Sequence, residues 1–282
     1  MFDPNTFFNT VNPNKNIIVA YSGGVDSTAM LHFCYELHKK KLLLGNLSAL
    51  HINHSLNTNS DLWEEHCQKF CEKRNIPFKS RTVEVSKKKS GLESAARQAR
   101  YKIFTEVLKS NDQILLAHHA DDVAETVLFR LFRGTGLDGL QGPMKKRYLG
   151  EGVLLRPWLD HTKSELIKYL SDHKIQHITD ESNFNDDQDR NFIRNELMEL
   201  ISGRWPNAPK QIQQTSELIF KHKKTYDILL EQKFGSQIKG LKLHRKFLLD
   251  LDESTCIEII RYWIKKNNVA MPNKKILGEI LK

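Results

Sequence analysis

The sequence has few cysteines and prolines, and it has no long apolar run. Its 282 residues contain four cysteines and eight prolines. All four cysteines fall within helix-like patterns, which argues against a disulfide framework; they are Cys34, Cys67, Cys71 and Cys256. Cys67 and Cys71 lack a second metal-like pair, so we assign no metal to them. No segment approaches the apolar length that a membrane span needs, so we expect no membrane partner.

The N-terminus also lacks a secretory signal. The segment MFDPNTFFNTVNPNKN has no basic start followed by an apolar centre and a small-residue cleavage site. We therefore expect a cytoplasmic protein. The last residues, MPNKKILGEILK, continue a helical pattern without a stop signal, so truncation of the chain stays an open alternative. The sequence does not fix the oligomeric state, and a homodimer also stays open.

The positive charge is concentrated near the C-terminus. The formal net charge is +9, and residues 203–282 contain 16 lysines and arginines against 8 acidic residues. The first 202 residues are therefore almost neutral. We predict a larger domain at 1–202 and a smaller basic domain at 203–282. Clustered basic residues favour a polyanionic partner, although a solvated basic surface would have the same composition.

Strand-like and helix-like segments alternate along the first domain. The predicted strands are Ile17–Tyr21, Leu47–Asn53, Phe78–Val85, Gln113–His118 and the short run Val153–Trp158. The predicted helices between them are Ser27–Lys40, Asp61–Arg74, Glu93–Lys109 and Asp121–Phe132. This alternation predicts an α/β fold with a doubly wound, mainly parallel sheet. After it, Gln211–Phe234 and Glu253–Lys266 predict a smaller helical C-terminal domain.

The segment Ser-Gly-Gly-Val-Asp-Ser follows the first predicted strand and opens the first predicted helix. Gly23 and Gly24 allow a tight turn that presents N–H groups, and the helix dipole favours an anion at the same place. Ser22 and Ser27 add hydroxyl donors, and Val25 adds a backbone N–H. Asp26 would repel a phosphate unless Mg²⁺ lay between them, so we predict a nucleotide bridged by a metal. The sequence lacks the Walker ending Gly-Lys-Ser/Thr and has no GxGxxG at this turn.

This turn resembles the PP-loop of the ATP pyrophosphatases, and further motifs narrow the resemblance. They are LHINH at 50–54, ESAARQARY at 93–101, LLAHHADDVAET at 115–126, RLFRGTGLDGLQG at 130–142, RPW at 156–158 and DESNFNDDQDRNFIRN at 180–195. Together they resemble the tRNA(Ile)-lysidine synthetase family from Ile17 to about Pro206. The resemblance implies a catalytic PP-loop domain at 1–202 and a tRNA-recognition domain at 203–282.

The family resemblance implies ATP and Mg²⁺ as cofactors, and free L-lysine and a minor isoleucine tRNA with a CAU anticodon as partners. In that reaction the oxygen on C2 of the wobble cytidine attacks ATP, pyrophosphate is released, and the lysine side chain then displaces AMP from the adenylated cytidine. The product is lysidine. The proton acceptor for the lysine amine stays open.

The resemblance also implies roles for particular residues. Asp122 and Glu125, three residues apart on one predicted helix face, would bind lysine, although an acidic helix start could equally be solvated. We assign Asp26, Asp122, Glu125 and Arg97 to catalysis. We assign the turn, His51 and His119 to nucleotide binding, with His118 as an alternative to His119. Arg100 is a weaker candidate than Arg97 for the phosphates.

Six basic residues are predicted to contact tRNA: Arg130, Arg133, Arg190, Arg194, Lys223 and Lys224. Asp186, Asp187 and Asp189 could instead pair with the two arginines at 190 and 194. The nearest alternative function is a PP-loop tRNA 2-thiolase, but the sequence has no C-x-x-C to carry sulfur. A small-molecule amidotransferase of this fold would not need the basic domain. A nucleotide-binding sensor without turnover would have little use for three carboxylates at the predicted site.

Overall fold

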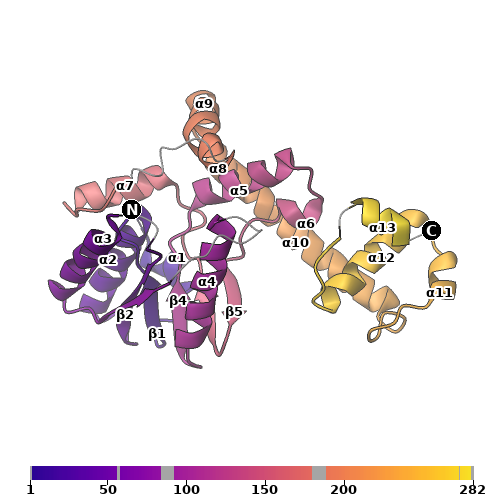
Figure 1. Ribbon diagram of the computed structural model, residues 1–282, viewed down its shortest axis with the longest axis horizontal. Coiled ribbons are helices and arrows are strands. Elements are labelled where there is room, and N and C mark those ends of the chain that lie inside the picture. The colour runs from indigo at the N-terminus through magenta and orange to yellow at the C-terminus, as the bar shows by residue number, and fades with distance from the viewer. Residues whose placement is uncertain (1, 56–57, 84–91, 180–188, 273, 281–282) are drawn as a thin grey trace. The chain divides into compact units, whose positions relative to one another are not determined.

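The computed structural model describes residues 2–55, 58–83, 92–179, 189–272 and 274–280 (Figure 1). These residues form two compact units, Met1–Glu217 and Leu218–Lys282. The division falls inside helix α10 (Ala208–Phe234), so the first ten residues of that helix belong to the first unit. The predicted boundary after residue 202 lies earlier, within helix α9 (Met198–Arg204).

The first unit is built on a six-stranded sheet with the order β3-β2-β1-β4-β6-β5. Its strands are β1 (Asn16–Ala20), β2 (Leu47–Asn53), β3 (Phe78–Thr82), β4 (Asp112–Leu115), β5 (Lys146–Leu149) and β6 (Gly152–Leu155). Strands β3, β2, β1, β4 and β6 run parallel to one another, which confirms the predicted mainly parallel sheet. The apolar residues of β1, β2 and β6 suit a sheet that is covered on both faces.

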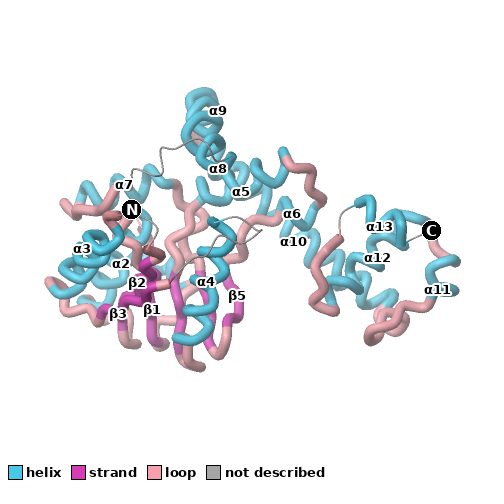
Figure 2. Tube along the Cα trace, in the orientation of Figure 1, coloured by secondary structure: helices cyan, strands magenta, loops and turns pink. Residues whose placement is uncertain are grey.

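Helices cover both faces of the sheet (Figures 1 and 2). One core packs strand residues such as Val19 and Leu115 against α2 (Val25–Lys39), α3 (Ser60–Glu72) and α7 (Lys163–Asp172). The opposite core packs Ile18, Leu50 and Ile114 against α4 (Leu92–Val107). The short helix α1 (Pro4–Phe8) joins the first core through Phe7.

One part of the sheet differs from the sequence-based expectation. Strand β5 was not predicted, because its residues Lys146–Leu149 are mostly polar and exposed. It pairs antiparallel with β6 and forms the edge of the sheet, where alternation with a buried face is weak. The last two residues of the predicted strand Phe78–Val85 lie outside the described residues.

The strand order reverses between β1 and β4, which creates a switch point beside β1. The chain passes from β1 outward to β2 and β3, and then returns to the other side of β1 with β4. Helices α2 and α5 (Ala120–Phe132) begin near the carboxyl ends of β1 and β4. Ligands bind at such a point in open α/β sheets. The predicted phosphate turn therefore lies where this topology provides a site.

Several further helices belong to the first unit. Helix α7 begins with a capping box, because Thr162 N–H donates to Glu165 Oε2 at 2.7 Å and Thr162 Oγ1 accepts from Glu165 N–H at 3.4 Å. Next come α8 (Asp189–Phe192), the π-helical stretch η2 (Ile193–Leu197) and α9. The short helix α6 (Leu137–Leu140) follows α5.

The second unit contains the later part of α10, then α11 (Arg245–Leu249), α12 (Glu253–Lys266) and α13 (Lys274–Ile280). Its core includes Leu230, Phe234 and Ile259. The helical C-terminal region is therefore as predicted. Among the described residues, no helix combines the length and apolar character needed to cross a membrane.

Candidate active site

The turn after β1 is held by hydrogen bonds among its own residues. Ser22 N–H donates to Ser27 Oγ at 3.1 Å, and Thr28 Oγ1 donates to the Gly23 carbonyl at 2.9 Å. Gly23 has φ +85°, and a Cβ there would meet Ile178 Cδ1 at 2.5 Å and Cys67 Sγ at 2.9 Å. Glycine is therefore required at residue 23 both for its backbone conformation and for space.

Helix α2 begins at this turn with its first N–H groups uncapped by any side chain. Gly24 is the N-cap residue, and a glycine has no side chain to accept from these donors. The helix start therefore offers backbone donors and the positive end of the dipole to an anion. Asp26 lies in the first turn, with a side chain 37% exposed.

Asp26 can also take part in a metal site. Its Oδ1 atom is buried and accepts no hydrogen bond from the described residues, although His119 Nε2 lies at an ion-pair distance of 3.4 Å from it. A single carboxylate beside phosphate donors suits Mg²⁺, which is usually held by one or two protein carboxylates together with substrate phosphates and water. The donor set thus fits the predicted metal, which Asp26 would help to hold.

A cavity of about 280 Å³ lies beside the turn. Its lining combines the turn with the ends of β1, β2 and β4 and with α4; it includes Ser22, Gly24, Asp26, Ser27, Leu50, Ile52, His54, Arg100, Phe104, His118 and Asp122. A lining that contains both apolar side chains and hydrogen-bond donors suits a nucleotide.

The cavity distinguishes between neighbouring candidates from the sequence. His54 lines it, whereas His51 is 5% exposed and donates from Nδ1 to the Tyr21 carbonyl at 2.9 Å. Arg100 lines it, whereas Arg97 is exposed and donates to the Tyr101 hydroxyl at 3.2 Å. His51 and Arg97, which the sequence suggested for the nucleotide, thus lie beside the cavity. His54 and Arg100, each three positions later in the chain, line its wall.

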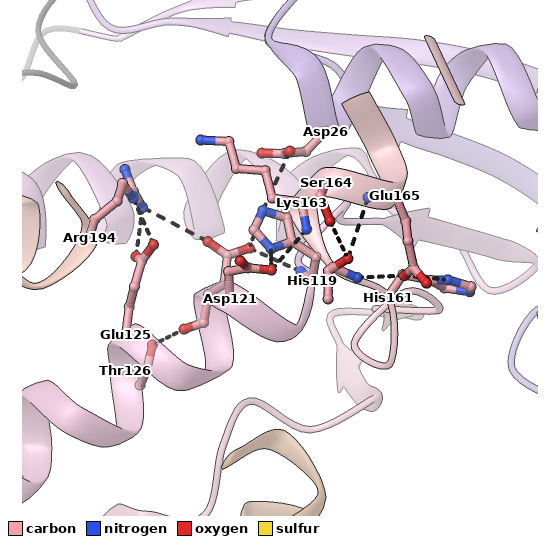
Figure 3. Close-up of polar contacts among 12 residues, drawn as sticks. Asp26, His119, Asp121, Glu125, Thr126, His161, Lys163, Ser164, Glu165 and Arg194 are labelled. Atoms are coloured by element: carbon pink, nitrogen blue, oxygen red, sulfur yellow. Dashed lines mark hydrogen bonds and ion pairs between the residues drawn. The ribbon is translucent and has the colours of Figure 1, made fainter. Parts of the chain in front are cut away.

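His119 lies among three carboxylates at the start of α5 (Figure 3). Its Nε2 is 3.4 Å from Asp26 Oδ1 and 3.6 Å from Asp122 Oδ2, and its Nδ1 is 3.4 Å from Asp121 Oδ2. Burial alone would lower the pKa of His119, but the carboxylates of Asp122, Asp121 and Asp26 raise that pKa well above its ordinary value. The imidazolium therefore connects the phosphate turn to the predicted lysine-binding helix.

Glu125 lies one turn further along α5 and is buried, with 3% exposure. Arg194 of η2 binds it with two parallel hydrogen bonds of 2.7 Å, and Arg190 Nε is 3.6 Å from Glu125 Oε2 (Figure 3). Arg194 Nη2 also lies 4.0 Å from Asp122 Oδ1. The two predicted lysine-binding carboxylates thus converge, and they do so around a guanidinium that is one of the predicted tRNA contacts.

Asp186 and Asp187, the alternative partners of these arginines, lie outside the described residues. Within the described part of the chain, both arginines face Glu125, which sequence reasoning did not connect with them. The π-helical turn that carries Arg194 is the kind of irregularity that often marks a functional site.

Arg156 was quoted in a motif but not assigned a role. It is 3% exposed and follows β6, and it donates to His118 Nδ1, the Met144 carbonyl and the Tyr101 hydroxyl, each at 2.8 Å. The sequence held one signal for a role at the site: Arg156 lies in the second half of the predicted strand Val153–Trp158, and ligands bind at the carboxyl ends of the strands in such a sheet.

The remaining predicted tRNA contacts occupy different environments. Arg130 donates to the carbonyls of Gly139 and Gln141, so it holds the glycine-punctuated segment. Arg133 is exposed beside the Phe129 ring. In the second unit, Lys224 is exposed, whereas Lys223 is 7% exposed and pairs with Glu258 at 3.1 Å and Asp227 at 3.3 Å.

The chain is similar to proteins that modify tRNA. The family model ATP_bind_3, described as a PP-loop domain, matches residues 4–201. The tRNA(Ile)-lysidine synthase of Buchnera aphidicola subsp. Schizaphis graminum is 35% identical over 93% of this chain and 59% of its own length. The enzyme of the same name from Coxiella burnetii is 36% identical over 97% of this chain and 61% of its own. The chain thus spans about three fifths of these relatives.

A solved structure has the same fold with little sequence identity. The U34-tRNA thiolase NcsA from Methanococcus maripaludis, solved with its [4Fe-4S] cluster, matches with a TM-score of 0.62 and 17% identity, over 77% of this chain and 78% of that one. This likeness concerns the fold alone. Because the family model covers about two thirds of the residues of this chain, the chain belongs to the PP-loop domain family.

Proposed function

We propose that this protein joins free L-lysine to the wobble cytidine of a minor isoleucine tRNA with a CAU anticodon and forms lysidine. The observation that carries the proposal is the pair Asp122 and Glu125, which converges beside the phosphate turn on one guanidinium. Two carboxylates around a cation are suited to an ammonium group. The relatives named tRNA(Ile)-lysidine synthase support the same reaction.

The turn and the start of α2 would bind the phosphates of ATP through backbone N–H groups and the hydroxyls of Ser22 and Ser27. Asp26 would hold Mg²⁺ against those phosphates, and its charge would be balanced by His119 on the other side. ATP activates the cytosine C2 oxygen: this oxygen takes the AMP group and pyrophosphate is released. The oxygen can then leave as part of AMP. These residues therefore orient the phosphates and balance their charge.

Lysine binding to Glu125 has to overcome an existing ion pair. Arg194 occupies both carboxylate oxygens at 2.7 Å, so an arriving ammonium must share or displace that guanidinium. A displaced Arg194 would be available to a phosphate of tRNA. This exchange would reconcile the predicted tRNA role of Arg194 with its pairing to Glu125. The reaction would take place in the cytoplasm, where tRNA, ATP and free lysine meet, with the basic second unit contributing to tRNA binding.

The thiolase alternative needs a sulfur carrier at the site. The structural neighbour is a tRNA thiolase, but the four cysteines of this chain are all buried and none lines the cavity beside the turn. Burial raises the pKa of Cys67 to about 12 and that of Cys71 to about 12, which disfavours thiolate chemistry. The observed lining therefore favours an amine nucleophile.

The test is pyrophosphate release from ATP with an isoleucine tRNA transcript bearing a CAU anticodon, measured with and without radiolabelled lysine. We expect pyrophosphate release that depends on the transcript, and lysine label in the tRNA at the wobble cytidine. A transcript with uridine in place of that cytidine is the matched control and should take up no label. Pyrophosphate release without lysine incorporation would reject the ligase and favour another nucleophile.

A further inference from the structure

Arg156 and His118 meet at the carboxyl edge of two neighbouring parallel strands. His118 follows β4 and Arg156 follows β6, and the two strands are paired through Leu115 and Leu155. Arg156 is held in place by its three side-chain hydrogen bonds and by its own N–H, which donates to the Lys145 carbonyl at 2.8 Å. Its position relative to His118 is therefore fixed by the sheet and by its own buried contacts.

The contact between the two side chains determines where His118 carries its proton. A guanidinium is only a donor, so His118 Nδ1, which lies 2.8 Å from Arg156 Nε, must accept and cannot carry hydrogen. The single proton of a neutral imidazole then lies on Nε2. Burial and the nearby arginines, including Arg156, lower the pKa of His118 to about 4 against the opposing effect of Asp122. The ring is therefore neutral near neutral pH.

The Nε2 edge of His118 faces a different environment from the Nδ1 edge. His118 is partly exposed and lines the cavity beside the phosphate turn. Among the residues that the structure describes, Nε2 has no hydrogen-bond partner, and it is not among the buried atoms without partners. Because Arg156 occupies Nδ1, Nε2 is the ring nitrogen that remains for an oxygen of a ligand bound in the cavity.

We propose that Arg156 is a positioning residue that locks His118 in its Nε2–H tautomer, so that a neutral imidazole donates a hydrogen bond to a nucleotide phosphate oxygen in the cavity. The inference rests on the proposed function for its ligand. It assigns His118 the role of a donor and excludes it as the base for the lysine amine. Nδ1 is occupied by Arg156, and Nε2 has no lone pair to accept a proton.

The first test observes the tautomer without any activity. Imidazole nitrogens of the full chain, labelled with ¹⁵N-histidine, are recorded by NMR, and His118 is assigned from the signal lost in His118→Gln. We expect an unprotonated Nδ1 and a protonated Nε2 in the unmodified protein. Arg156→Met should give a tautomer mixture or a protonated ring. Tyr101→Phe removes one partner of Arg156 but keeps the Nε contact, so it should leave the tautomer unchanged. A protonated Nδ1 in the unmodified protein, or an unchanged tautomer in Arg156→Met, would overturn the inference.

The second test keeps Arg156 intact, so it is informative even if the Arg156→Met protein does not fold. Glutamine at residue 118 can place an amide N–H near the position of Nε2, whereas asparagine replaces only the Nδ1 side. We expect kcat for transcript-dependent pyrophosphate release to be about 10-fold or more higher in His118→Gln than in His118→Asn, since losing one donor to a developing charge costs about 100-fold or more. Equal rates, or a faster His118→Asn, would reject the donor role.

The two tests separate this inference from the proposed function. If the unmodified protein shows the Nε2–H tautomer and releases pyrophosphate but incorporates no lysine, the proposed ligase fails while the inference stands. If it makes lysidine but His118 carries its proton on Nδ1, the inference fails while the proposed ligase stands.

Discussion

The ion pairs of the first unit and those of the second unit have different consequences, although both involve several charges of each sign. In the first unit, charges from α2, α5 and η2 meet at the edge of the sheet, and Glu125 is almost completely buried. In the second unit, lysines on α10 and α12 pair with carboxylates on the same two helices, and Lys265 and Lys266 are 51% and 38% exposed. Buried pairs are costly to break, whereas exposed pairs contribute little.

The comparison also changes the meaning of the basic composition of the C-terminal region. Lys223, Lys265 and Lys266 each lie within 3.3 Å of a carboxylate of the same unit. Part of the excess positive charge is therefore already paired and is less able to attract phosphates. A count of basic residues indicates the sign of a surface, but the pairing decides which residues can bind a polyanion.

The largest effect should come from removing Asp26, because we propose that its carboxylate acts at the bound phosphates of the nucleotide. In Asp26→Ala, we expect pyrophosphate release to fall about 100-fold or more, since the carboxylate at the phosphate turn is lost. The measurement is transcript-dependent pyrophosphate release at saturating ATP.

Asp172→Ala is the matched control, because Asp172 is an exposed carboxylate that pairs only with Lys168 among the described residues. It should retain the rate of the unmodified protein. Equal rates of pyrophosphate release in Asp26→Ala and Asp172→Ala would show that Asp26 matters no more to the reaction than an exposed carboxylate.

The next largest effect compares one buried carboxylate with one half-exposed carboxylate. Glu125→Gln removes the carboxylate charge and leaves Arg194 one amide oxygen in place of the two oxygens bound at 2.7 Å, so we expect the free energy of unfolding to fall by about 1–3 kcal/mol. Glu231→Gln in the second unit, where the partner Lys266 is 38% exposed, should cost less than about 1 kcal/mol. The measurement is urea unfolding of each variant.

A double variant shows whether the lost stability comes from the ion pair between Glu125 and Arg194. Glu125→Gln with Arg194→Met removes the unpaired guanidinium and should recover part of the lost stability. In activity assays, Glu125→Gln should raise KM for lysine and spare pyrophosphate release. Loss of both steps to the same extent would contradict its assignment to lysine.

A smaller effect tests which lysines of the second unit can meet tRNA. Lys224→Glu should weaken tRNA binding about 3- to 10-fold at moderate salt and reduce the salt dependence by about one phosphate contact. Lys223→Glu should instead lower the melting temperature of the protein, because it places a third carboxylate beside Asp227 and Glu258. Filter binding and thermal melts measure the two effects. Weaker tRNA binding in Lys223→Glu without a change in melting temperature would contradict this division.

The fold could be predicted from the sequence because local patterns determine it. Apolar strands, the capping box at Thr162 and the glycine turn each depend on residues close in the chain. The turn could also be proposed as a phosphate site from the sequence, since all of its residues are consecutive in the chain. Strand β5 was missed because an exposed edge strand leaves no apolar pattern.

The pairing within the site could not be predicted in the same way. Arg194 reaches Glu125 across 69 residues, and Arg156 reaches His118 across 38. Sequence spacing says which side chains share one element, but not which elements the sheet brings together. The same limit explains why Lys223 and Lys224, adjacent in sequence, have different environments: they lie on different faces of one helix.

The smallest effect concerns pH, and it distinguishes the two units through His119. The pKa of His119 is raised in the folded protein, so protonation of its imidazole stabilises the fold. This stabilisation is fully present below the ordinary pKa of about 6.5, and it is lost as the pH rises through the raised pKa. The partner carboxylates Asp121 and Asp122 have lowered pKa values and stay ionised throughout that range. We therefore expect thermal melts of the ligand-free chain to show stability falling as the pH rises from about 6.5 through the raised pKa of His119, and His119→Gln to weaken that fall. The lysine–carboxylate pairs of the second unit contain groups that ordinarily titrate far from neutrality, so Glu258→Gln should leave the slope unchanged. A slope that persists in His119→Gln would mean that the imidazole is not the charge connecting the turn to α5.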